Sequence, residues 1–73
     1  MPKIDIVSEV TGRVWKIEAN VGDAVDAEQT VVIVESMKME IPVAAPAAGR
    51  VAALRVAEGD AVEEGQAIGQ IDT

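Results

Sequence analysis

Apolar and polar residues alternate with a period of two over residues 37–43. Polar or turn-forming residues separate the apolar positions, which are Met37, Met39, Ile41 and Val43. Such alternation is typical of a β-strand with one buried face, so Lys38 and Glu40 are expected to point away from the core. A helical turn over 35–41 with Ser36 as its N-cap is the alternative. The β-branched run before this segment and the proline within it disfavour that helix.

Other segments show strand-like patterns separated by short turns. Residues 31–35 form a nearly continuous β-branched run, of the kind that is buried on both faces of a sheet. Mixed apolar and polar runs predict further strands at 13–18, 50–56 and 67–71. The chain has twelve Val and seven Ile against one Leu, and β-branched side chains suit a pleated surface. These patterns predict an all-β fold.

The sequence repeats itself without a gap at an offset of 37 residues. The matching segments are Gly12-Arg13-Val14 with Gly49-Arg50-Val51, and Gly22-Asp23-Ala24-Val25 with Gly59-Asp60-Ala61-Val62. The repeats cover about 12–35 and 49–72, and a hairpin with a crossover at 36–48 joins them in a single domain of residues 1–73. Two repeats are too few for a solenoid. We therefore predict two similar half-sheets packed face to face about an approximate twofold axis.

The turns of the two halves agree at most positions. Gly22-Asp23 and Gly59-Asp60 occupy equivalent turns, where glycine permits a positive φ and aspartate can bond the local backbone. One equivalent pair differs, because Glu28 stands opposite Gly65. If that turn requires a positive φ, Glu28 carries a cost of roughly 1 kcal/mol or more.

The connection between 31–35 and the alternating strand leaves room only for a tight hairpin. Two-residue hairpin turns normally contain Asn-Gly, Asp-Gly or Gly-Gly, because their central residues adopt positive φ. This turn offers Met37 and Lys38 instead. A local violation in an otherwise consistent sequence indicates a functional or strained site, which singles out Lys38. An ordinary solvated lysine at a hairpin tip is the alternative.

The composition excludes several kinds of chemistry. The 73 residues include no Cys and no His, so the chain offers no thiolate nucleophile, imidazole base or zinc-thiolate site. A net charge of −7 and a single aromatic residue oppose binding to nucleic acid. The apolar run at 31–34 is far too short for a membrane span, and the first residues lack a signal peptide's apolar stretch. We expect a cytoplasmic, non-catalytic module that is monomeric alone and binds no metal.

The residues around the tip resemble those of a known family. Glu35-Ser36-Met37-Lys38-Met39-Glu40 is similar to the biotin attachment motif of biotin carboxyl carrier domains, whose core is Met-Lys-Met in a tight hairpin. The paired Gly-Asp turns, Gly12, Gly49 and the two-half layout extend the resemblance to the biotinyl and lipoyl attachment family over essentially the whole chain. The resemblance implies a flattened β-barrel of two four-stranded antiparallel sheets with pseudo-twofold symmetry.

For function, the resemblance implies a carrier rather than an enzyme. Lys38 would carry biotin in an amide made by a biotin protein ligase. The residues flanking this attachment site would be Glu35, Ser36, Met37, Met39 and Glu40. The biotin arm would shuttle a carboxyl group from a biotin carboxylase to a carboxyltransferase, and these partners would supply the catalysis. The uniform offset leaves no place for an insertion, so the chain resembles a stand-alone attachment protein or the biotinyl domain of a larger carboxylase.

Two alternatives to a biotin carrier stay open at the level of the sequence. Lipoyl domains resemble the same fold but usually present Asp-Lys-Ala at the tip, so Met37 and Met39 favour biotin over lipoate. The second alternative is an unmodified β-sandwich interaction module, in which Lys38 has no chemical role.

Overall fold

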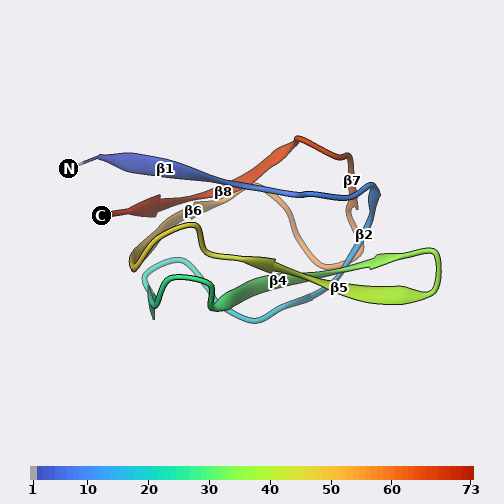
Figure 1. The fold of residues 1–73 in the computed structure, drawn as a ribbon, viewed down its shortest axis with the longest axis horizontal. Coiled ribbons are helices and arrows are strands. Elements are labelled where there is room, and N and C mark those ends of the chain that lie inside the picture. Colours follow the sequence, from blue (N-terminus) through green and yellow to red (C-terminus); the bar gives the residue numbers. More distant parts are fainter. Residues whose placement is uncertain (1) are drawn as a thin grey trace.

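Two four-stranded antiparallel sheets make up the described part of the chain, residues 2–73 of a computed structural model (Figure 1). The strand order in the first sheet is β1 (Lys3–Val7), β8 (Ala67–Asp72), β6 (Gly49–Leu54) and β3 (Ala24–Val25). The order in the second is β5 (Met39–Ala44), β4 (Thr30–Ser36), β2 (Gly12–Ile17) and β7 (Ala61–Val62). The predicted fold class is confirmed. Residues 2–73 contain no helix that is long and apolar enough to cross a membrane.

The two sheets are related by the offset of 37 residues that the sequence shows. The repeat places β2 with β6, β3 with β7 and β4 with β8, and these pairs hold equivalent places in the two sheets. Strand β1, which the sequence analysis did not assign, corresponds to β5, with Ile4 equivalent to Ile41. In the other sheet, the position equivalent to the β4–β5 turn lies between the end of β8 and the start of β1. There Thr73 N donates to Pro2 O at 3.0 Å. The turn therefore lies at one end of the molecule and the ends of β1 and β8 lie at the other (Figure 1).

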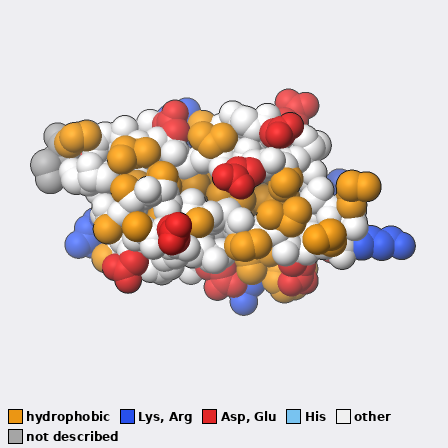
Figure 2. Space-filling model, in the orientation of Figure 1, with side chains coloured by type: hydrophobic (Ala, Val, Ile, Leu, Met, Phe, Trp, Pro, Cys, Tyr) orange, Lys and Arg blue, Asp and Glu red, His pale blue; other side chains and the backbone are white. Residues whose placement is uncertain are grey.

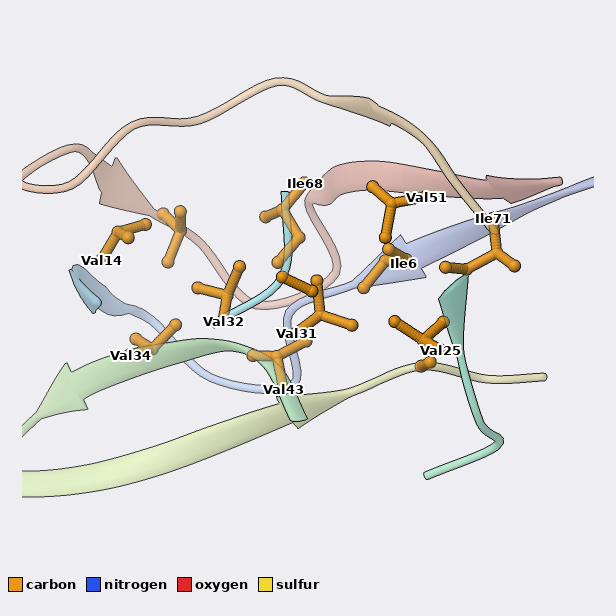
Figure 3. Close-up of a cluster of buried hydrophobic side chains, with 13 residues drawn as sticks. Ile6, Val14, Val25, Val31, Val32, Val34, Val43, Val51, Ile68 and Ile71 are labelled. Carbon is orange, nitrogen blue, oxygen red and sulfur yellow. The ribbon is translucent and has the colours of Figure 1, made fainter. Parts of the chain in front are cut away.

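Valine and isoleucine side chains from both sheets fill the space between them (Figure 3). Burial of one such side chain contributes about 1.5–3 kcal/mol relative to its exposed state. The core ends before the hairpin does. Val34 and Ile41 are the last inward-facing pair with a buried member, and Ser36 and Met39 follow them toward the turn. The last rows of the hairpin therefore project beyond the core.

Strand β4 departs from the prediction that both of its faces are buried. A register shift near its start turns Val31 inward beside Val32 and Val34, and all three are fully buried. Ile33 lies on the outer face opposite Pro42 and stays partly exposed. The prediction was wrong at Ile33, because two packed sheets bury only the inner face of each.

The turn at Glu28 has the strained backbone that the repeat suggested. Glu28 has a φ of 69°, and the equivalent Gly65 has a φ of 85°. The left-handed region costs a non-glycine residue roughly 1–2 kcal/mol. Backbone hydrogen bonds hold the strained turn in place, since Glu28 N donates to Ala45 O at 2.8 Å and Ala45 N donates to Gln29 O at 2.8 Å.

Glu28→Gly is expected to raise the free energy of unfolding by roughly 0.5–1 kcal/mol, because relief of the strain exceeds the entropy that glycine adds to the unfolded chain. Urea denaturation followed by circular dichroism measures the change. Gly65→Ala is the matched control and is expected to lose about 1 kcal/mol. A Cβ at Gly65 meets no atom within 4 Å, so this control tests the backbone conformation alone. Urea denaturation midpoints that stay at the native value in both Glu28→Gly and Gly65→Ala would contradict the account of strain.

Candidate functional site

A two-residue turn, Met37-Lys38, joins β4 to β5 at the projecting end of the molecule (Figure 1). Ser36 and Met39 form the last cross-strand pair before the turn. Met37 has a φ of 51° and Lys38 a φ of 67°. A positive φ at both central residues is what a type I′ hairpin turn requires. The chain thus forms the tight hairpin without the usual Asn or Gly, and the helical alternative for this segment is wrong.

The end of β4 beside the turn is tied to the rest of the fold through Thr11. Ser36 Oγ donates to Thr11 O at 2.8 Å, and Glu64 N donates to Thr11 Oγ1 at 3.1 Å. Thr11 therefore links the end of β4 to the turn that precedes β8. Nothing in the sequence marks Thr11, because the repeat gives no signal of a contact with a residue 25 positions away.

The side chains at the turn are exposed to solvent. Met37 is 92% exposed, Met39 is 63% exposed, and Lys38 is exposed between them. The side chain of Lys38 forms no salt bridge or hydrogen bond with residues 2–73. Figure 2 shows a basic side chain extending beyond the rest of the surface at the end where the hairpin lies. This amine is accessible to the active site of another protein.

Two glutamates lie directly opposite each other below the turn. Glu35 of β4 pairs with Glu40 of β5, and Arg13 of β2 lies opposite Glu35 on its other side. Like charges in a cross-strand pair are destabilising. The equivalent row of the other sheet places one acid between two bases, at Lys3, Asp72 and Arg50. Glu40 therefore adds a second carboxylate that the fold does not need, two residues from Lys38.

The structure gathers all six motif residues into the last rows of one hairpin, where they fit covalent attachment of a carboxylic acid. The amine of Lys38 can form an amide with an activated carboxyl group. Met37 and Met39 flank it with flexible, polarizable side chains that adapt to a partner surface. Ser36 holds the end of β4 beside the turn to Thr11.

Met37→Asn combined with Lys38→Gly is expected to raise the free energy of unfolding by about 1 kcal/mol, because Asn-Gly adopts this turn without strain. The variant also removes the amine. Urea denaturation compares it with the native chain, and Met39→Leu serves as a control outside the turn that leaves the backbone conformation unchanged. Stability equal to or below that of the native chain would show that the Met-Lys turn is not strained.

Comparison with known proteins decides the family. The family model described as "Biotin-requiring enzyme", Biotin_lipoyl, matches residues 1–71. The chain belongs to the biotin/lipoyl attachment family. The biotin/lipoyl attachment protein of Bacillus subtilis (strain 168) is 42% identical over 60 residues, which cover 82% of each chain. The urea amidolyase of Saccharomyces cerevisiae is 38% identical over 68 residues, which cover 93% of this chain and 4% of that protein.

Solved structures of a urea carboxylase and of a lipoyl domain contain this same fold. The Kluyveromyces lactis urea carboxylase matches with a TM-score of 0.93 and 40% identity, over 99% of this chain and 6% of that one. The lipoyl domain of the 2-oxoglutarate dehydrogenase complex from Azotobacter vinelandii matches with a TM-score of 0.78 and 29% identity, over 96% of each chain. The attachment domain therefore spans nearly all of some relatives and a small part of much larger enzymes.

Proposed function

We propose that this chain is a biotin carboxyl carrier and that Lys38 is its attachment site. The observation that carries the proposal is the exposed amine of Lys38 on a positive-φ turn, in a chain of the biotin/lipoyl attachment family. Met37 and Met39 support biotin over lipoate.

The chain's part in its own modification is to present a nucleophile. Amide formation at Lys38 Nζ releases a proton, which a biotin protein ligase takes up as the amine attacks. The new N–C bond forms at the activated biotinyl carbonyl carbon, and the bond from that carbon to the adenylate leaving group breaks. When bound, biotin supplies a ureido nitrogen that carries a carboxyl group from a biotin carboxylase to a carboxyltransferase.

The fold supports this role by holding the amine at a defined place while leaving it accessible. The pair Val34 and Ile41 anchors the hairpin in the core, and Ser36 ties the end of β4 beside the turn to Thr11. The molecule is 36 Å long and 18 Å wide, with the tip at one end, so a narrow surface enters the partner's active site. Attachment to the carrier raises the local concentration of the transferred group at each partner. In this proposal catalysis stays with these partners in the cytoplasm, and the chain carries the transferred group between them.

The carrier role is tested with the biotinylated chain, a biotin carboxylase, ATP and radiolabelled bicarbonate. Label is expected on the native chain, measured by rapid gel filtration and scintillation counting. Lys38→Arg treated in the same way is the control and is expected to remain unlabelled. A fully biotinylated chain that takes no label from carboxylases of the acyl-CoA, pyruvate and urea classes would overturn the carrier role.

A further inference from the structure

A shallow groove of about 500 Å³ lies on the outer face of the sheet that carries the hairpin. The residues that line it are Glu18, Gln29, Thr30, Ile33, Glu40 and Pro42. Ile33 and Pro42 are directly opposite each other in β4 and β5 and supply its apolar part. Glu40, two residues from Lys38, supplies a carboxylate at the tip end. The groove is therefore continuous with the surface that surrounds the amine.

The other sheet provides an internal comparison, because each groove residue has an equivalent 37 positions away. The pair Ile33 and Pro42 corresponds to Gln70 and Asp5, which face each other in β8 and β1. Gln70 Nε2 donates to Asp5 Oδ1 at 3.1 Å, so this outer face satisfies its own polar groups. The fold therefore accepts a hydrogen-bonded polar pair at these two positions and does not require the apolar pair Ile33 and Pro42.

The charges are also inverted between the two outer faces. Glu40 of the groove corresponds to Lys3, and Glu18 corresponds to Arg55. Since basic residues occupy these positions in the other sheet, the fold does not require acids there. Glu18 is paired with Lys16 at 3.8 Å, so Glu40 is the groove acid that forms no salt bridge with residues 2–73. An apolar centre with this carboxylate at its tip end complements a partner that presents basic and apolar side chains.

The chemistry at Lys38 indicates which partner comes close enough to use this groove. An enzyme that acts at the far end of an attached arm can keep its surface away from the sheet. An enzyme that acylates Nζ must bring its catalytic groups to bonding distance of the amine, so its surface closes over the hairpin and reaches Glu40. We propose that the groove docks the acylating ligase through a basic and apolar surface of that enzyme, an inference that rests on the proposed function.

The first test compares two variants with the same change of charge on opposite outer faces. Initial rates of biotin incorporation by a biotin protein ligase are measured over a range of chain concentrations. Glu40→Lys is expected to raise KM about tenfold with kcat within about twofold, because docking weakens and the chemistry at Nζ is unaltered. Asp5→Lys, on the other sheet, is expected to keep both constants within about twofold of the native chain.

The second test exchanges the apolar residue for its equivalent. Ile33→Gln places in the groove the residue that the fold already accommodates at position 70, and it is expected to raise KM about fivefold. Gln70→Ile is the control and is expected to leave KM unchanged. Added salt is expected to raise KM for the native chain more than for Glu40→Lys, because screening weakens a charge-dependent contact. Thermal melts verify that each variant is folded.

The possible results distinguish failure of the docking proposal from failure of the proposed carrier function. Normal biotinylation of the native chain, with KM of Glu40→Lys and Ile33→Gln within about twofold of native, would overturn the docking proposal and leave the carrier function intact. An equal rise in KM for Asp5→Lys and Glu40→Lys would also overturn it, because net charge alone would explain the effect. No biotinylation of the native chain would overturn the proposed function and the docking proposal together.

Discussion

Lys38→Arg is expected to abolish biotin acceptance while leaving the free energy of unfolding within about 0.5 kcal/mol of the native value. Arginine keeps its proton at all physiological pH values, so its guanidinium is no nucleophile for an activated acyl group. The Lys38 side chain makes no internal hydrogen bond or salt bridge with residues 2–73, so its replacement removes no stabilising contact. Streptavidin blotting after treatment with biotin protein ligase measures the loss, and urea denaturation measures stability.

Lys3→Arg and Lys16→Arg are the matched controls for Lys38→Arg, since each replaces an exposed lysine outside the turn. Both are expected to accept biotin at the native rate. Biotin on the Lys38→Arg chain would contradict the assignment of the site. Under the alternative of an unmodified interaction module, the Lys38→Arg chain would retain every function of the native chain.

Gly49→Ala is expected to lower the free energy of unfolding by about 2–3 kcal/mol, the largest loss of stability that we predict for a single methyl group. An added Cβ would lie 2.5 Å from Asp72 O and 2.8 Å from Ile71 Cγ2. Both atoms belong to β8, the central neighbour of β6, so neither can move without disturbing the sheet. Urea denaturation followed by circular dichroism measures the loss.

Gly12→Ala tests the same close approach in the other sheet, where an added Cβ would overlap Glu35 O and lie 2.9 Å from Val34 Cγ1. A loss similar to that of Gly49→Ala is expected. Gly22→Ala is the control, because no atom lies within 4 Å of its Cβ and only its φ of 96° opposes the substitution. It is expected to lose about 1 kcal/mol. An equal loss at all three glycines would contradict the steric account of Gly12 and Gly49.

The hairpin could be predicted from sequence because its constraints are local. The alternating strand and the β-branched run leave only Ser36-Met37-Lys38 between them, and Met37-Lys38 conflicts with the usual turn residues. The strained Glu28 was found in the same way, by comparison with Gly65 at the equivalent position. Each inference used only the φ values that a short turn requires and the residues that the other repeat places at its own turns.

The features that sequence could not supply depend on contacts between distant segments. Gly12 and Gly49 were visible as repeat matches, but the close approach that requires glycine involves a strand that follows more than 20 residues later. The inward position of Val31 depends on the register shift in β4, and the outward position of Ile33 depends on which face the packed sheets bury; the β-branched run conceals both. Thr11 acquires its role only when the turns before β2 and β8 meet beside the hairpin.

Intact mass spectrometry after incubation with biotin protein ligase, biotin and ATP tests the central claim most directly. A parallel incubation with lipoyl ligase and lipoate tests the alternative cofactor. The account predicts that each chain gains one biotinyl group in the first incubation and that peptide mapping places it on Lys38. No gain with biotin, a gain with lipoate alone, or a biotinyl group on Lys3 or Lys16 would contradict the account.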